Sequence, residues 1–259
     1  MTRRLLMGSL LLAGCATVPS APKSQLTLTW LSVGGWLIED GQHAVLIDPY
    51  FSRPADPFAS GVVSDLNAIE RYAPKKADVI LVGHAHVDHA LDAPVLAKRL
   101  HAPLVGSKAL GGNITVTGGE ALTFADGAIS VKVVPSRHSL IGEGQDTETF
   151  AYLVTMSGTQ VLVFDTANFN EEAITGLRPD LAILATGLRE KVPDYACRLM
   201  KALGAPKTIF TTHFDAWRSP VGTPLEQDTV DDLAQFTKEI HQCAAKSKVI
   251  VPELFVGLR

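Results

Sequence analysis

The chain has 259 residues, of which 46% are hydrophobic and 19% are charged, so it can bury the core of one large domain or two small ones. The formal net charge is -4 and no run of Lys or Arg follows the N-terminus, which argues against a nucleic-acid partner. The 21 Gly and 15 Pro are spread along the chain, as is typical of a loop-rich α/β domain rather than a disordered one.

The first 24 residues have the pattern of a targeting segment. Arg3 and Arg4 precede an apolar run at 5–13 that is too short to span a bilayer, which is typical of a signal peptide. The tetrapeptide ending at Cys15 resembles a bacterial lipoprotein signal, in which this cysteine carries the lipid; an ordinary signal peptide or a buried helix is the alternative. Because Ala16 is not acidic, the resemblance implies the cell envelope, at the outer membrane facing the periplasm. We expect a signal peptide at 1–14, a lipidated tether at 15–24 and one hydrolase domain at 25–259.

Two further cysteines, Cys197 and Cys243, lie in stretches with a helical pattern. Neither has the spacing of a metal ligand. A disulfide between them is compatible with an oxidising compartment, but spacing alone cannot establish it. We expect two buried free thiols.

The predicted domain opens with an antiparallel meander. Residues 26–31 alternate between apolar and polar, and a tight turn at 40–42 joins strands at 36–39 and 44–47. Helices are then expected at 64–72, 92–100, 193–203 and 225–245, with a short one from 170. Further strands are expected at 79–82, 103–105, several between 114 and 134, 150–156, 160–164, 181–185, 208–211 and 249–251. This order predicts a single α/β domain of two sheets packed face to face with helices outside.

The stretch at 82–90 is the most distinctive. Its polar side chains follow directly after an apolar strand, and they are His84, His86, Asp88 and His89. A polar turn is the alternative, but three of the chain's eight histidines within six residues are hard to explain by packing.

Three more candidate ligands, His138, Asp165 and His213, also follow apolar strands. If these strand ends share one edge of the sheets, four loops converge on one pocket. Imidazoles and carboxylates suit Zn²⁺, and the absence of a cysteine ligand leaves Mn²⁺ and Fe open. Five histidines and two aspartates are enough for two divalent ions that activate water. The other histidines, at 43, 101 and 241, are expected to be structural or solvated.

This ligand pattern, from His84 to His213, resembles that of the metallo-β-lactamase superfamily. The opening residues 29–49 resemble its branch of metal-dependent hydrolases that includes ascorbate-6-phosphate lactonase and the phospholipase D acting on N-acyl phosphatidylethanolamine. The resemblance covers the chain from about residue 26 and implies a four-layer αββα sandwich. One departure is that Ser32–Trp36 stands where the branch usually has a Gly-His pair.

The resemblance implies two metal sites and a catalytic role for one residue. Asp88 would orient a hydroxide that bridges the ions and attacks the substrate. The first ion would be held by His84, His86 and His138, the second by Asp88, His89 and His213, and Asp165 would bridge the two.

Residues around the ligands are expected to support the imidazoles or the substrate. Asp48, Asp92 and Asp215 are candidates for hydrogen bonds to the metal-binding histidines. Four side chains flank the ligand loops as candidate substrate contacts, with solvated loop side chains as the favoured alternative for each, namely Arg137, Arg189, Trp217 and Arg218. Residues 51–61 and 141–147 are candidate lids.

The function expected is hydrolysis of a small ester, lactone or phosphodiester by two metal ions, most simply Zn²⁺. An iron-dependent redox enzyme on the same fold, a β-lactam hydrolase and an anchored binding module with structural metals are the alternatives. The expected partners are a small-molecule substrate and a membrane reached through the lipid at Cys15.

Overall fold

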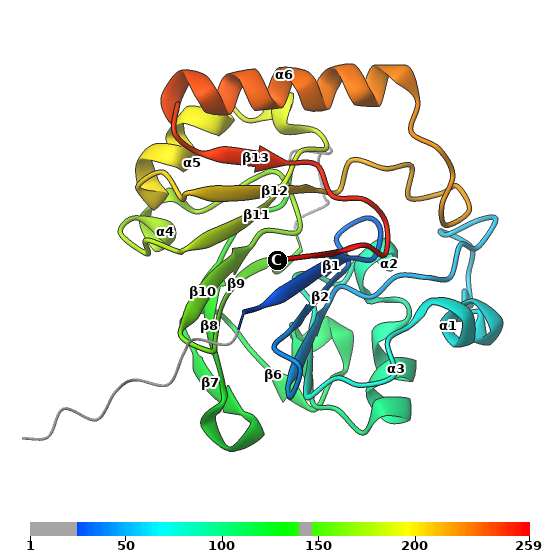
Figure 1. The fold of residues 1–259 in the computed structure, drawn as a ribbon. Helices are drawn as coiled ribbons and strands as arrows, with labels where there is room; N and C mark the ends of the chain where they lie inside the picture. The colour runs from blue at the N-terminus through cyan, green and yellow to red at the C-terminus, as the bar shows by residue number, and fades with distance from the viewer. Residues whose placement is uncertain (1–24, 140–146) are drawn as a thin grey trace, which may run out of the picture.

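Two seven-stranded sheets form the centre of the computed structural model, which describes residues 25–139 and 147–259 (Figure 1). The first sheet has the order β14-β1-β2-β3-β4-β5-β6 and the second the order β13-β12-β11-β10-β9-β8-β7. The strands of the first sheet are β1 (Thr27–Trp30), β2 (Trp36–Glu39), β3 (Ala44–Ile47), β4 (Val79–Leu81), β5 (Leu104–Gly106), β6 (Ile114–Thr115) and β14 (Gly257–Leu258). Those of the second are β7 (Ala121–Phe124), β8 (Ile129–Pro135), β9 (Phe150–Met156), β10 (Thr159–Val163), β11 (Leu181–Ala185), β12 (Thr208–Thr212) and β13 (Lys248–Ile250).

Helices cover the outer face of each sheet, so the domain has four layers, and the predicted αββα sandwich is confirmed (Figure 1). Three helices, α1 (Leu66–Tyr72), α2 (Val87–Ala90) and α3 (Ala93–Leu100), accompany the first sheet. The other three, α4 (Glu171–Ile174), α5 (Tyr195–Leu203) and α6 (Gln227–Cys243), accompany the second. Among the described residues, no helix is long and apolar enough to cross a membrane.

Each sheet changes from antiparallel to parallel pairing partway across. In the first, β1, β2 and β3 form the predicted meander, and β3 then pairs in parallel with β4. In the second, β7 to β10 pair in an antiparallel manner, and β10 to β13 are parallel. Parallel neighbours end at the same sheet edge, so the segments that follow β10, β11 and β12 emerge together.

Apolar side chains fill the space between the sheets. The alternation in β1 turns Leu28 and Trp30 inward, as its period of two requires. Two buried hydrogen bonds cross this core: Trp36 Nε1 donates to Thr212 Oγ1 at 2.9 Å, and the Tyr152 hydroxyl donates to the Val82 carbonyl at 2.7 Å. Both bonds lie near the strand ends that carry candidate ligands, so they help to fix the relative position of the two sheets there.

The expectation of free thiols was wrong. A disulfide joins Cys197 in α5 to Cys243 in α6, with the Cα atoms 5.2 Å apart. The two helices pack side by side on the second sheet, which brings residues 46 positions apart into bonding range.

Candidate metal centre

Four strands deliver the predicted ligands to one edge of the sandwich. The ligand-rich stretch follows β4 of the first sheet, while His138, Asp165 and His213 follow β8, β10 and β12 of the second. The stretch is a loop and one helical turn rather than a plain turn, because α2 contains Asp88 and His89. The structure brings all seven candidates together in three overlapping groups.

The first group consists of three imidazoles, His84, His86 and His138, whose ligand atoms lie within 4.8 Å of one another. His84 Nε2 is 3.1 Å from His86 Nδ1, and the His86 and His138 rings are 4.6 Å apart. His138 Nδ1 lies 2.8 Å from the Ser139 carbonyl oxygen. Since a carbonyl only accepts, Nδ1 carries the proton and Nε2 keeps its lone pair for a metal.

The second group consists of one carboxylate, Asp88, and two imidazoles, His89 and His213. Asp88 Oδ2 lies 3.5 Å from His89 Nε2 and 3.3 Å from His213 Nε2. The two imidazole nitrogens are themselves 3.1 Å apart. Three ligand atoms therefore face a common point, as a divalent ion requires.

Asp165 lies between these two groups. Its Oδ2 atom is 2.6 Å from His84 Nδ1 and 3.8 Å from His89 Nδ1. Its Oδ1 atom is buried and has no hydrogen-bond partner among the described residues. A buried carboxylate oxygen that accepts no hydrogen bond destabilises the fold unless a cation binds it, so this atom fits a metal-binding role.

Glycine is required beside two of the ligands. A Cβ at Gly83 would lie 2.1 Å from an oxygen of Asp165, and one at Gly34 would lie 2.8 Å from the His89 ring. Both glycines belong to the first sheet, Gly34 in the turn between β1 and β2 and Gly83 directly after β4, so the backbone of this sheet approaches the ligands as closely as atoms allow. In the sequence, Gly83 stands directly before His84. This position alone does not reveal that the glycine contacts Asp165.

The electrostatics keep the ligand set ready for a cation. Burial lowers the pKa of His86 and His89, and it lowers the pKa of His138 to about 4, so these rings are neutral at pH 7. Burial alone would raise the pKa of Asp88, but the nearby His89 and His213 hold it far below its ordinary value. His213 behaves oppositely to the other rings: burial lowers its pKa, but the contact with Asp88 outweighs this and raises it.

Of the three supporting aspartates, only Asp48 hydrogen-bonds to a candidate ligand. It is fully buried, its Oδ2 lies 3.1 Å from His89 Nδ1, and its Oδ1 accepts from the Gly83 backbone N–H at 2.8 Å. Burial, together with the charge of Asp165, raises its pKa. Asp48 therefore sets the orientation of the His89 ring.

Asp92 and Asp215 instead anchor loops. Asp92 accepts hydrogen bonds from the backbone N–H groups of Phe51 and Ser52 and from the Ser52 hydroxyl. Asp215 accepts from the Ser32 hydroxyl and the Val33 backbone N–H. Both carboxylates hold the chain segments around the ligands rather than the imidazoles.

The expected substrate contacts divide into two kinds. Arg189 is buried against α6, where it pairs with Asp232 at 2.5 Å and Glu239 at 3.1 Å, so it stabilises the fold and does not reach substrate. Arg137 and Arg218 are exposed. The Trp217 ring meets the ring of Phe58, 6.0 Å away, so the loop after β12 touches the loop after β3. Of the candidate lids, residues 140–146 lie outside the described residues.

A buried cation beside the second group was missed from the sequence. Arg53 pairs with Asp215 at 4.0 Å, donates to the Ser32 hydroxyl and to the Trp217 carbonyl, and lies over the Tyr50 ring. It ties together the first turn and two loops. This first turn is the segment Ser32–Trp36, which stands where the resembled branch usually has a Gly-His pair. Here Val33 is fully buried and offers no titratable group in place of that histidine.

The fold and the site define the class of protein. Residues 27–213 match the family described as "Beta-lactamase superfamily domain", which is most of the chain. The chain belongs to this superfamily and has the metallo-β-lactamase fold.

Relatives narrow the class to one group. A UPF0173 metal-dependent hydrolase of Archaeoglobus fulgidus is 31% identical over 228 residues, covering 82% of this chain and 91% of the relative. Another from Ruegeria sp. is 29% identical over 227 residues, covering 80% and 93%. The chain is thus a metal-dependent hydrolase of the UPF0173 type.

Solved structures agree on the fold. The metallo hydrolase Igni18 of Ignicoccus hospitalis has a TM-score of 0.63 at 19% identity, covering 90% of this chain and 97% of that one. The diiron β-hydroxylase CmlA of Streptomyces venezuelae has a TM-score of 0.64 at 14% identity, and the match covers 92% of this chain but 55% of that protein. At these identities the likeness concerns the fold alone.

Proposed function

We propose that the protein is a dinuclear hydrolase, most simply a Zn²⁺ enzyme, that cleaves a small ester, lactone or phosphodiester. The observation that carries this proposal is the position of Asp165, whose Oδ2 atom lies beside one imidazole of each ligand group and whose buried Oδ1 atom has no hydrogen-bond partner among the described residues. A single closed structural site needs four ligands and no such sharing. Two groups that share a carboxylate are what a pair of neighbouring ions requires.

Each residue has a defined task in this proposal. His84, His86 and His138 would hold one ion, and Asp88, His89 and His213 the other. When bound, the two ions would activate a water molecule as the nucleophile and stabilise the charge that develops on the substrate.

Asp88 orients the attacking water rather than taking up its proton for long. The neighbouring imidazoles hold the pKa of this carboxyl far below its ordinary value, so it stays ionised at any working pH. Such a carboxylate accepts a hydrogen bond well and is a weak base. His213, whose pKa is raised by the same contact, is the imidazole of this group most readily protonated.

Two loops beside the second group would select the substrate. Residues 51–61 and 214–218 meet at the Phe58–Trp217 contact, and Arg218 lies over both rings at 5.1 and 4.7 Å from their centroids. Phe58 remains 73% exposed, which is unusual for a phenylalanine that serves only packing. These two loops therefore offer the apolar rings of Phe58 and Trp217 and the positive charge of Arg218 to a substrate with an apolar body and an anionic or polar group.

An activity panel tests the proposal. The purified protein, loaded with Zn²⁺ or Mn²⁺, is assayed with aryl esters, lactones, bis(p-nitrophenyl) phosphate and a β-lactam. We expect hydrolysis in at least one of the first three classes, loss on chelation and return with metal. Asp88→Asn should reduce kcat by at least about 100-fold, whereas His101→Asn, at an exposed histidine outside the three groups, should not.

Metal analysis separates this proposal from its alternatives. Two ions per chain are expected in the wild type. Stoichiometric iron with oxygen consumption would instead indicate a redox enzyme, and one tightly held ion with no turnover would indicate a structural site.

We also propose that the protein is anchored in the bacterial envelope through a lipid on Cys15. Residues 1–24 lie outside the described residues, so the support is the lipoprotein-like sequence and the Cys197–Cys243 disulfide, since such bonds persist in oxidising compartments. Cys15→Ser should release the protein from the membrane fraction. A wild-type N-terminal peptide whose mass includes no acyl chains would contradict lipidation.

A further inference from the structure

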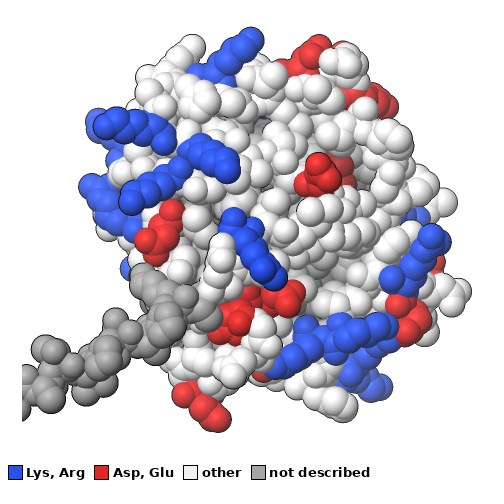
Figure 2. All heavy atoms as spheres, viewed as in Figure 1, with Lys and Arg blue, Asp and Glu red and all other residues white. Residues whose placement is uncertain are grey.

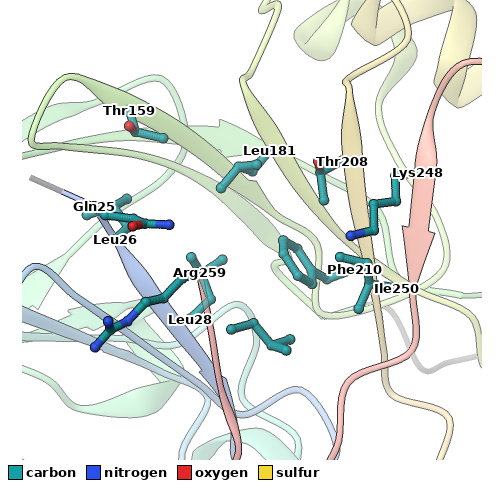
Figure 3. Close-up of a pocket in the computed structure, with 11 residues that line it drawn as sticks. Gln25, Leu26, Leu28, Thr159, Leu181, Thr208, Phe210, Lys248, Ile250 and Arg259 are labelled. Carbon is teal, nitrogen blue, oxygen red and sulfur yellow. The ribbon is translucent and has the colours of Figure 1, made fainter. Parts of the chain in front are cut away.

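A second cavity opens between the two sheets, away from the metal centre. Its volume is about 540 Å³, within the range of small-ligand sites. It lies where the edge strands β14 and β1 of the first sheet face the parallel strands β11, β12 and β13 of the second (Figure 3).

The cavity and the metal centre occupy opposite ends of the strands. Leu181 and Thr208, which line the cavity, are the first residues of β11 and β12. His213 directly follows the last residue of β12. Phe210, the lining residue of β12 that comes nearest to His213 in the chain, is three positions before it, or roughly 10 Å along the strand, and none of the proposed metal ligands lines the cavity.

The walls of the cavity are apolar. They continue the hydrophobic core outward, because each apolar lining residue either belongs to the core between the sheets or packs against it. These residues are Leu26, Leu28, Leu181, Phe210, Ile250 and Leu258. An aliphatic chain that enters would therefore replace water on surfaces that the fold itself leaves unfilled.

Cations stand at the opening. Lys248 and Arg259 are both exposed and both line the cavity, and no Asp or Glu side chain is among the described lining residues. Since Arg259 is the last residue of the chain and also carries an α-carboxylate, Lys248 supplies the net positive charge. Figure 3 shows the Lys248 ammonium group turned toward the cavity, beside Thr208 and above Phe210. In the wider view, this face carries scattered Lys and Arg together with several Asp and Glu around a largely uncharged area, so the positive charge is local to the opening (Figure 2).

We propose that this cavity binds a single-chain anionic amphiphile, such as a fatty-acid carboxylate, with its chain between the sheets and its head at Lys248. Apolar walls alone would accept any hydrophobic guest. The cation at an opening without side-chain carboxylates selects the negative head, since a positive head would gain nothing there. The site is independent of hydrolysis at the metal centre.

Calorimetric titration of the metal-loaded protein tests the proposal, with dodecanoate below its micelle concentration as the probe. Dodecanoate should bind, and dodecyltrimethylammonium, of equal chain length and opposite charge, should bind at least about fivefold more weakly. Octanoate and decanoate should bind progressively more weakly, by up to about fourfold per methylene removed. Equal affinity for the two head groups, or no binding of dodecanoate, would overturn the proposal.

Variants locate the binding site. Lys248→Glu should weaken dodecanoate binding by about fivefold or more, whereas Lys246→Glu, the same change at an exposed lysine outside the lining, should not. Ile250→Trp projects a larger ring into the cavity from a half-buried position and should abolish binding. The melting temperature and metal content of each variant are measured as controls. The affinities are compared only when both values equal those of the wild type. Equal effects of the two lysine changes would overturn the assigned site.

Vesicles distinguish a free amphiphile from a bilayer. If phosphatidylglycerol vesicles bind through Lys248 while dodecanoate does not, the face is a membrane-docking surface and the proposal fails. Dodecanoate binding that both Lys248→Glu and Ile250→Trp reduce supports it.

Discussion

Removal of the disulfide gives the sharpest test of the structure. Cys197→Ser combined with Cys243→Ser cuts the bond between α5 and α6 and leaves both side chains nearly the same size. The bond closes a segment with a sequence separation of 46 residues. In the chain-entropy account, this loop length corresponds to about 4 kcal/mol of restriction on the unfolded state.

The predicted loss of stability is large enough to measure by two methods. For a domain of this size it corresponds to a decrease in melting temperature of roughly 8–16 °C. Urea unfolding is measured for the metal-loaded wild type, for the wild type with a phosphine reductant and for the double variant. The unfolding midpoints of the last two samples should agree with each other and lie well below that of the first. Metal content should not change, because neither cysteine belongs to the ligand groups.

The double variant is also the control for the reductant. Its unfolding midpoint should not move when reductant is added. A wild-type midpoint that is equally insensitive would refute the reasoning, since it would mean that the bond does not restrict the unfolded chain or does not form.

Three further predictions concern the metal centre and its loops. Gly83→Ala should eject at least one ion, because its Cβ would lie 2.1 Å from an oxygen of Asp165; wild-type metal content in the folded variant would contradict this. On acidification, the ion held by His213 should leave first: the pKa of this ring is raised, so protons compete as pH falls through a value above 6.5, whereas the pKa of His138 is about 4. Metal counts after dialysis at stepwise lower pH would show this order, and simultaneous loss would disprove it. Arg53→Met should lower the urea-unfolding free energy by about 1–2 kcal/mol, because the guanidinium loses its hydrogen bonds to the Ser32 hydroxyl and the Trp217 carbonyl and its ion pair with Asp215; an unchanged midpoint would count against the loop-anchoring role.

Local sequence patterns were sufficient to predict most of the fold. The alternation at 26–31 and the turn at 40–42 predict β1 to β3 because their period and turn chemistry do not depend on distant residues. The short β14 was not predicted, since it is a strand only through its pairing of Leu258 with Leu28 at the sheet edge. The disulfide was missed for the same reason: which helices pack together is decided by the tertiary structure.

The candidate site was predictable where ligands follow strands and less so elsewhere. His138, Asp165 and His213 follow apolar strands, and sheet edges bring such positions together. The roles of Asp92 and Asp215 depend on the path of neighbouring loops, which sequence spacing does not specify. Arg189 resembled a substrate contact because only the folded chain shows that α6 covers it.

Each ligand group draws on both sheets, since residues after β4 meet residues after β8 or β12. An ion bound there is therefore a removable cross-link between the halves of the sandwich, and its binding energy is linked to folding. Each tenfold rise in free metal above the dissociation constant adds about 1.4 kcal/mol per ion to the stability of the whole domain. Scarcity of metal would then speed hydrogen exchange and proteolysis across the inter-sheet core, so that metal supply governs the lifetime of the protein as well as its activity.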